Sequence, residues 1–391
     1  MSILKIKVEG LKLFKDVLEV DFTAIQRVRS GKNEMLYEIS PQIRTNNALA
    51  LIGINASGKT TTLKVISFVI QLLNNQSINN IESREILKGL KKNEKIVVES
   101  YFCVGKESVN KLKTTIIKSK NSIDGEDKFI IDEESMWSKS VKSVDTIKNL
   151  FKFEENDISQ IRDKNEEFLP EDISIVIALN KKYGLKVNYM DTLDWTNVNL
   201  IRILGDFPKE LIKFLDPSIE YLRTNLNVND EKLEIRLKFN AKEEILLYSP
   251  MELAKYLSSG TIKGINVFVN AMRVLDEGGY LIIDELENHF NKEIVSTLIR
   301  FFMSKKVNKK GAVIIFSTHY PELLDEFERN DNIFIIRNHE GIEVDNLSRI
   351  LCRNDIKKSE VYQSGYLHGT VPAYEAYMDL KRVVVEYGGE K

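Results

Sequence analysis

Residues 53–62 read GINASGKTTT, and their types and spacing are those of a loop that binds phosphate groups. In such a loop, backbone N–H groups surround the phosphates, a lysine reaches the terminal phosphates, and the hydroxyl that follows the lysine is a ligand for Mg²⁺. Lys59 and Thr60 take these two roles. The other candidate binding residues of the loop are Gly53, Asn55, Ala56, Ser57, Gly58 and Thr61.

Two acidic residues follow a separate apolar run at residues 280–283. Asp284 is expected at the carboxyl end of a buried strand, where ligands bind in open α/β sheets. There it can hold Mg²⁺ through water, and Glu285 can polarise an attacking water molecule. Taken alone, the pair is equally typical of solvated acids at a strand end. The phosphate loop elsewhere in the chain is what favours a magnesium site.

His319 lies in the string STHYP, two residues after another apolar run. A histidine at that position can contact the γ-phosphate of a nucleotide, although a lone histidine at a strand end is more often an ordinary polar loop residue. The spacing favours the phosphate contact, because the residues between Glu285 and His319 leave room for one helix and one strand. That order is a βαβ step.

A second anion site is predicted at residues 257–263, which read LSSGTIK. Small residues at the start of a helix leave backbone N–H groups exposed. The simpler interpretation is a helix cap formed by Ser258 or Ser259. Because the chain already has its own phosphate loop, a second site would serve the γ-phosphate of a nucleotide held by another subunit. Ser258, Ser259 and Gly260 are the candidate residues.

The sequence around these motifs predicts the elements that position them. An apolar run over residues 47–54 leads directly into the phosphate loop, as a buried central strand would. After the loop, apolar residues recur at helical spacing from Leu63 to Leu73. Three alternating runs within residues 94–134 predict an antiparallel meander. The phosphate motif therefore has the strand, loop and helix context that it needs.

The order of the motifs resembles that of an ABC-type ATPase head, namely Walker A, signature, Walker B and switch histidine. LSSGT resembles the LSGGQ signature, with Ser258 at the serine position, Ser259 and Gly260 at the two glycine positions and Thr261 at the glutamine position. The resemblance implies ATP and Mg²⁺ as cofactors. It also implies a homodimer or higher homo-oligomer, in which the signature completes the ATP site of a facing subunit.

The same resemblance assigns the catalytic residues. Glu285 matches the catalytic glutamate, His319 the switch histidine and Lys59 the Walker A lysine, while Thr60 and Asp284 are the predicted metal ligands. Two parts of the head are not assigned. No glutamine that could form a Q-loop follows a strand between residues 95 and 105, and no aromatic residue is assigned to the adenine.

Within the class, GINASGKT with Asn55 and the early strand in ILKIKVEGLKLFKD resemble the branch that includes SMC, RecF and OLD proteins. The chain is most similar to the OLD-like ATPases of bacterial phage defence and abortive infection, such as the AbiL, PARIS and Septu ATPase subunits. This likeness implies a sensor ATPase that controls a separate effector protein, a nuclease or toxin from a neighbouring gene.

A RecF-like DNA-binding repair ATPase is the alternative function. Basic runs at residues 87–95 and 305–310 can meet nucleic-acid phosphates, although such runs are more often solvated faces. Salt-dependent DNA binding by the pure protein would distinguish the two functions. Nucleic acid is therefore the candidate partner under this alternative.

Three further classes fit the motifs less well. A transporter subunit carries its signature much closer to Walker A than the 199 positions between Lys59 and Ser258. A GTPase needs a base-reading NKxD string, and the nearest one, NKKY at residues 180–183, lacks the acid. An OLD nuclease needs an acidic C-terminal domain, and the residues after His319 have no cluster of carboxylates at strand ends. No nuclease activity is therefore predicted for this chain.

Composition sets the broad class. The chain has 391 residues, which at roughly 100–200 residues per domain allows one large domain or two to three smaller ones. Hydrophobic residues make up 43%, charged residues 29%, and the net charge is −2, so the overall charge does not favour nucleic acid. The two cysteines form no CxxC pair, and no apolar run reaches the roughly 18 residues of a membrane span. A cytoplasmic protein without a membrane partner is expected.

These observations predict an α/β fold, specifically a P-loop NTPase head of ABC type. Its mixed sheet would carry an antiparallel β subdomain and a helical insertion. Residues 1–137 and 226–345 are expected to form the two parts of the head. Residues 138–225 are expected to form the helical insertion, a surface for partner recognition, and residues 346–391 a C-terminal helical tail.

Overall fold

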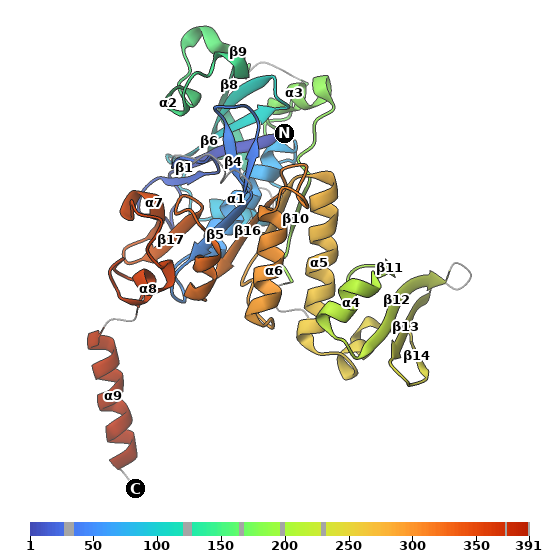
Figure 1. Cartoon of the computed structure of the whole chain (residues 1–391). Coiled ribbons are helices and arrows are strands. Elements are labelled where there is room, and N and C mark those ends of the chain that lie inside the picture. Colours follow the sequence, from blue (N-terminus) through green and yellow to red (C-terminus); the bar gives the residue numbers. More distant parts are fainter. Residues whose placement is uncertain are drawn as a thin grey trace.

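The computed structural model describes residues 1–26, 35–119, 127–163, 168–195, 200–227, 232–371 and 374–389. Within these stretches, a central α/β core lies between an antiparallel sheet and a smaller lobe (Figure 1). A short hairpin of β3 (Leu36–Glu38) and β4 (Arg44–Asn46) accompanies the core. The predicted α/β class with a mixed sheet and an antiparallel subdomain is confirmed.

The central sheet has the strand order β10-β15-β16-β5-β17-β18. Neighbouring strands are parallel except for β17 and β18, which are antiparallel. Their bounds are Tyr189–Asp191 for β10, Tyr280–Ile283 for β15, Val313–Thr318 for β16, Ala48–Ile52 for β5, Ile333–Asn338 for β17 and Ile342–Asn346 for β18. Because β5, β15 and β16 are parallel, their carboxyl ends meet at one edge of the sheet, where the motif residues follow.

Both faces of the central sheet are covered, which explains why its strands are continuous apolar runs. Val313 and Ile315 of β16 pack into a core shared with α1 (Lys59–Leu73) and the antiparallel sheet. Ile314 and Phe316 point to the opposite face and pack with α5 (Ser259–Glu277) and α6 (Lys292–Met303). The alternation of side chains along a strand thus divides the apolar residues between two cores.

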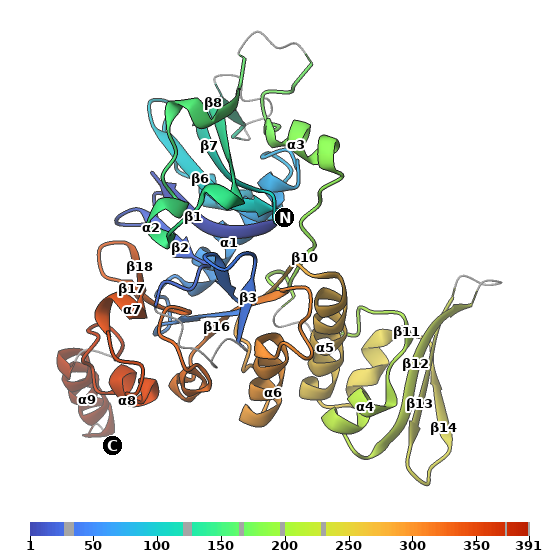
Figure 2. The same ribbon diagram turned by 45° about the horizontal axis from the view of Figure 1, so that its top comes forward.

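The antiparallel sheet covers α1 and has the order β2-β1-β6-β7-β8-β9 (Figure 2). Its strands are β1 (Ser2–Glu9), β2 (Leu18–Asp21), β6 (Lys95–Val104), β7 (Ser108–Lys118), β8 (Phe129–Ser140) and β9 (Ile158–Ile161). The predicted three-stranded meander corresponds to β6, β7 and β8. Its alternating pattern arises because one face of each strand packs on the core.

Residues 138–225 are not the mostly helical insertion that local apolar spacing predicts. The stretch contains α2 (Ile147–Leu150), α3 (Val176–Tyr183) and α4 (Lys209–Leu215), but it also contributes strands to all three large sheets. The prediction of helix was wrong because β9, β10 and β12 pair with strands elsewhere, and tertiary pairing overrides the spacing of a few apolar residues. Residues 138 and 225 themselves fall inside β8 and β12.

The smaller lobe is an antiparallel sheet backed by α4. Its strands are β11 (Gly205–Asp206), β12 (Ile219–Asn227), β13 (Lys232–Phe239) and β14 (Glu244–Leu247). The apolar face of this sheet packs against α4 and against Ile262 and Ile265 of α5. A Cβ on Gly264 would come within 2.6 Å of the Leu215 side chain, so α4 and α5 are in close contact. The lobe therefore supports the helix that begins with the predicted signature.

Beyond residue 345 the described chain is helical, with α7 (Leu347–Ile350), α8 (Lys358–Gln363) and α9 (Tyr374–Gly389). α9 extends away from the body (Figure 1). Short 3-10 helices cover Glu82–Leu87, Val141–Ser143, Glu155–Asp157, Pro250–Lys255 and Pro321–Glu326. No helix within the described stretches is long and apolar enough to cross a membrane.

Candidate functional site

The predicted phosphate loop connects β5 to α1 at the carboxyl end of the central sheet. Backbone geometry requires glycine at both glycine positions of the loop. Gly58 precedes α1 with a φ of 103°, in the left-handed region that favours glycine. A Cβ on Gly53 would come within 2.4 Å of Ile336 O and of Ser57 Oγ, so no side chain fits there. The tight loop leaves its N–H groups at the start of a helix, which is a site for anions.

Lys59 is folded back onto this loop. Its Nζ donates hydrogen bonds to Gly53 O at 3.0 Å and Ile54 O at 3.1 Å, and it lies 3.3 Å from His319 Nδ1. Burial lowers the pKa of Lys59, and nearby carboxylates, the strongest being Asp284, partly offset this effect. The acceptors of the ammonium group are uncharged carbonyl oxygens, so phosphate oxygens would be stronger acceptors for it.

Asp284 and Thr60, the two predicted magnesium ligands, are in contact. Thr60 Oγ1 donates to Asp284 Oδ2 at 2.8 Å, and Ser317 Oγ donates to Asp284 Oδ1 at 2.5 Å. The Asp284 N–H donates to Thr192 Oγ1 at 3.3 Å, which ties this residue to the segment after β10. A hydroxyl and a carboxylate side by side fit Mg²⁺, which completes its shell with water and phosphate oxygens.

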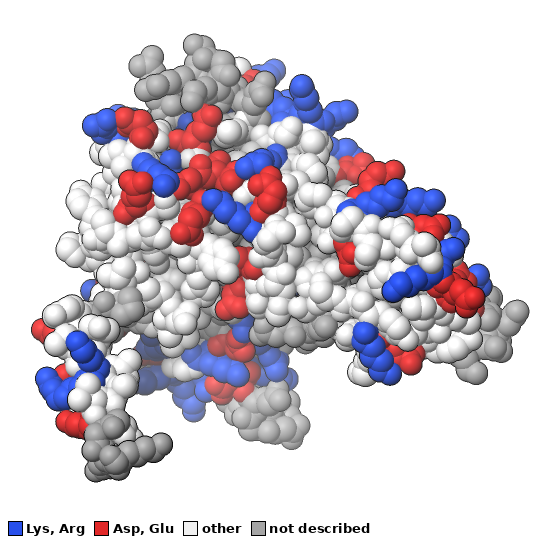
Figure 3. Space-filling model, turned by 60° about the horizontal axis from the view of Figure 1, so that its bottom comes forward, with Lys and Arg blue, Asp and Glu red and all other residues white. Residues whose placement is uncertain are grey.

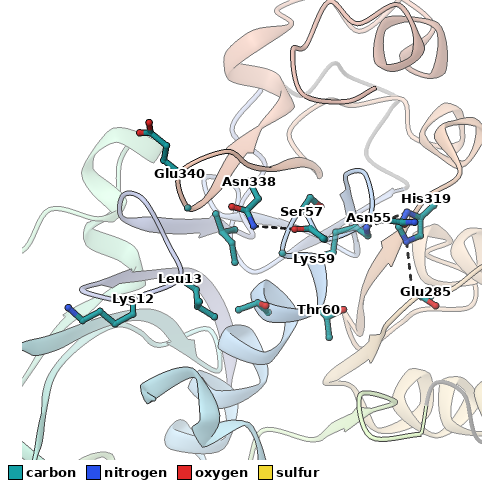
Figure 4. A pocket seen from close by; sticks show the side chains of 15 residues that line it. Lys12, Leu13, Asn55, Ser57, Lys59, Thr60, Glu285, His319, Asn338 and Glu340 are labelled. Atoms are coloured by element: carbon teal, nitrogen blue, oxygen red, sulfur yellow. Dashed lines mark hydrogen bonds and ion pairs between the residues drawn. The ribbon is translucent and has the colours of Figure 1, made fainter. Parts of the chain in front are cut away.

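Glu285 and His319 face each other at the same edge of the sheet (Figure 4), with Glu285 Oε1 3.8 Å from His319 Nε2. The Glu285 N–H donates to Ser317 Oγ at 2.7 Å, and Leu286 N donates to Ser317 O at 3.1 Å. Ser317 thus holds both acidic residues of the motif. Sequence reasoning quoted this serine in STHYP but gave it no role, although a hydroxyl at a strand end beside a candidate histidine was a usable signal.

A cavity of about 700 Å³ connects the phosphate loop with Glu285 and His319, while Asp284 is not among its described lining residues. Of the predicted set, Asn55, Ala56, Ser57, Gly58, Lys59, Thr60, Thr61, Glu285 and His319 line it. Its other walls were missed from the sequence and come from the loop after β1 and the turn between β17 and β18. They are Lys12, Leu13, Asn338, Glu340, Gly341 and Ile342. Asn338 Nδ2 donates to Ala56 O at 3.2 Å and so braces the phosphate loop (Figure 4).

The predicted signature is not part of this cavity, because Ser258, Ser259 and Gly260 are absent from its described lining. Ser258 Oγ instead accepts a hydrogen bond from Thr261 N at 3.0 Å and caps α5. The ordinary cap that the sequence allowed is therefore present. Ser259 Oγ lies 3.1 Å from His289 Nδ1. The structure thus brings together the phosphate loop, Asp284, Glu285 and His319, and places the signature outside that group.

Two buried charged residues behind the site were also missed. Lys263 of α5 is 5% exposed, and Glu287 is 6% exposed. Burial lowers the pKa of Lys263 to about 8, although Glu285, Glu287 and Asp284 act in the opposite direction. Glu287 Oε1 accepts a hydrogen bond from His319 N, while its buried Oε2 has no hydrogen-bond partner among the residues described. Lys263 lies at a helical position that the sequence pattern assigned only to an amphipathic helix.

A glycine loop between a central strand and a helix, with acidic residues ending an adjacent parallel strand, defines a P-loop nucleotide-binding protein. The family described as "AAA domain, putative AbiEii toxin, Type IV TA system" matches residues 49–325, and the chain belongs to this family. The match spans all of the motif residues, from the phosphate loop to His319.

Among solved structures, the chain is similar to the recombination mediator protein RecF in its RecF-ATP structure from the RecFOR pathway. The sequence identity is 10%, the TM-score is 0.37, and the similarity covers 88% of this chain and 97% of that chain. No curated protein matches the chain.

Proposed function

We propose that this protein hydrolyses ATP with Mg²⁺ in the cavity beside the phosphate loop. The observation that carries the proposal is the convergence of Lys59, Thr60, Asp284, Glu285 and His319 at one edge of the central sheet. Membership of an AAA ATPase family supports it. The chemistry relies on placement and electrostatic stabilisation, which such a group of side chains supplies.

The residues divide this work between them. The loop N–H groups and Lys59 bind the phosphates, and Thr60 and Asp284 hold Mg²⁺, which neutralises charge on the β- and γ-phosphates when it is bound. Glu285 orients a water molecule that attacks the γ-phosphorus. The bond from that phosphorus to the oxygen shared with the β-phosphate breaks, ADP and inorganic phosphate form, and the proton of the water passes to Glu285 or solvent. His319 contacts the γ-phosphate.

We further propose that two subunits face each other around two ATP molecules. The start of α5 supports this arrangement, because Ser258 is exposed and lies outside the cavity of its own chain. In such a dimer, the signature of each subunit completes the site of the other. The surfaces are then self-complementary, as a two-fold interface requires.

The biological role that we propose is control of a separate effector protein in an anti-phage, abortive-infection system. The family description, which names a putative AbiEii toxin of a type IV toxin–antitoxin system, supports this role. ATP binding would favour the closed dimer, and hydrolysis would weaken it by removing the γ-phosphate contact. That cycle could expose or cover an effector site. Co-purification with products of adjacent genes tests the partner directly.

The alternative, a RecF-like DNA-binding ATPase, receives no support from the face drawn in Figure 3. On the face in Figure 3, basic and acidic side chains of the described residues intermingle instead of forming one basic area. Nucleic-acid binding relies on clustered positive charge. Salt-dependent binding of duplex DNA by the pure protein would favour the alternative.

Glu285→Gln tests the proposed hydrolysis. The substitution removes the carboxylate that orients water and leaves the phosphate loop intact, so we expect ATP hydrolysis to fall by about 10²–10³-fold while ATP binding is retained. Glu293→Gln is the matched control, because Glu293 is an exposed carboxylate on α6. Steady-state phosphate release and ATP binding measure the two effects. Wild-type turnover in Glu285→Gln would contradict the assigned role of this residue.

A further inference from the structure

The first two turns of α5 lie directly against the loop that follows β15. Lys263 Nζ donates a hydrogen bond to Glu285 O at 3.3 Å. Ser259 Oγ lies 3.1 Å from His289 Nδ1, and a Cβ on Gly260 would come within 2.5 Å of His289 O. The helix that carries the predicted signature and the loop that carries the predicted catalytic glutamate are therefore in contact at several points.

Glu285 needs support from its surroundings, because its backbone has a φ of 49°. This left-handed conformation is unfavourable for a residue with a side chain and costs on the order of 1–3 kcal/mol. On one side, the Glu285 N–H donates to Ser317 Oγ at 2.7 Å. On the other side, the Glu285 carbonyl accepts hydrogen bonds from Asn288 N at 3.0 Å and from Lys263. Glu285 is thus held between β16 and α5.

Lys263 is a costly residue to place at this position. Its side chain is buried, and its Nζ lies 5.7 Å from the centre of the Phe290 ring. Burial of an ammonium group carries a desolvation penalty, and the nearby carboxylates offset it only in part, because the pKa of Lys263 is still lowered. A purely stabilising role therefore explains the lysine poorly, whereas a role in holding the Glu285 carbonyl explains why a long hydrogen-bond donor is needed.

We propose that Lys263 is a positioning residue for ATP hydrolysis. It fixes the Glu285 peptide so that the carboxylate faces the phosphate cavity and His319. This inference rests on the proposed ATPase function and deepens it. Because Lys263 lies on the helix whose first residues would meet the γ-phosphate of the facing subunit, the position of Glu285 also depends on how that helix is docked.

Lys263→Met tests the inference, since methionine retains most of the length and loses the hydrogen bond and the charge. We expect kcat to fall by about 10- to 100-fold, the cost of a misplaced catalytic group, while ATP affinity is unchanged. The melting temperature is measured beside kcat, as the separate readout of stability. Lys263→Arg should recover part of kcat, because it restores a donor. Lys292→Met is the matched control, an exposed lysine beside the same loop.

Wild-type kcat in a folded Lys263→Met protein would overturn the inference. A fall in melting temperature with unchanged kcat would do so as well, because it would assign a stabilising role alone. If Lys263→Met does not fold, Lys263→Gln decides by the same criteria, since its shorter side chain loses the hydrogen bond but keeps a polar group near Glu287. Absence of turnover in the wild-type protein contradicts the proposed function instead, so the two failures are distinguishable.

Discussion

The phosphate loop and the start of α5 are both helix N-termini built from small and polar residues, yet their surroundings differ. At the loop, side chains from β15 and β16 converge with Lys59 and Thr60 on one cavity. At α5, Ser258 accepts a hydrogen bond from its own helix, and none of residues 258–260 lines that cavity. The first region is assembled within one chain, whereas the second is capped by its own side chain and faces outward.

Because of this difference, we expect amino-acid substitutions in the two motifs to have different effects. Lys59 donates to two backbone carbonyl groups of its loop and lies next to His319, so its ammonium group is already where phosphates would bind. In the proposed dimer, the α5 N-terminus would receive its charged ligand, the γ-phosphate, from a nucleotide bound to the second subunit. A substitution at the start of α5 should therefore separate nucleotide binding from hydrolysis.

The largest effect is expected from Ser258→Arg. The bulk and charge of arginine should block the proposed dimer face, so ATP hydrolysis should fall to background, while ATP still binds the phosphate loop of the same chain. Mixing this variant with Lys59→Ala subunits should recover activity, because one composite site per heterodimer would again have an intact loop and an intact signature.

Ultracentrifugation with ATP and measurement of phosphate release check both statements. Ser258→Ala separates the effect of bulk from that of the lost hydroxyl, because it removes the cap without adding bulk, at a cost of about 0.5–2 kcal/mol in stability. A strictly monomeric Ser258→Arg protein with full activity would show that the site is complete within one chain, and the proposed difference between the two regions would disappear.

A smaller effect, on stability, is expected from Gly260→Ala. The added methyl group would come within 2.5 Å of His289 O, so the helix or the loop must move. Such overpacking typically costs about 1–3 kcal/mol in the free energy of unfolding. Denaturant unfolding measures it, with Ser259→Ala as a neighbouring control. Unchanged stability would mean that α5 and the loop after β15 are not held in close contact.

The smallest effect concerns pH. The pKa of Lys263 is lowered to about 8 from an ordinary value of 10.5. Between these pH values the unfolded chain keeps the proton and the folded chain releases it, so folding stability should rise with pH across this window. Lys263→Met should lack this contribution, so the stability gap between the two proteins should change from pH 8 to pH 10.5. Parallel curves would contradict the burial of a titrating lysine.

Much of the candidate site could be predicted from the sequence, because the residues of each motif are close together in the chain. The phosphate loop, the two acids after the strand YLII and His319 in STHYP each have a local pattern. Continuous apolar runs predicted the central strands, and alternating runs predicted the meander of β6, β7 and β8. The roles assigned to these residues remain predictions that the variants above test.

The parts of the fold and of the site that could not be predicted depend on contacts between residues that are distant in sequence. Residues 138–225 looked helical because short apolar spacings do not distinguish a helix from a strand that finds a distant partner. β10 is such a strand, and Thr192, just after it, accepts a hydrogen bond from Asp284. Lys12, in the loop after β1, and Asn338, at the end of β17, line the cavity although neither belongs to a nucleotide motif.

The sequence by itself determined the chemical groups, the order of the strands and helices around each motif, and the two glycine positions of the phosphate loop. Only the tertiary structure decided which groups meet, because parallel pairing of β5, β15 and β16 is what places their carboxyl ends at one edge. It also decided that Lys263 reaches the carbonyl group of Glu285, because the packing of α5 on the loop after β15 depends on long-range contacts. Local patterns specify side chains and elements, whereas long-range packing specifies the distances between them.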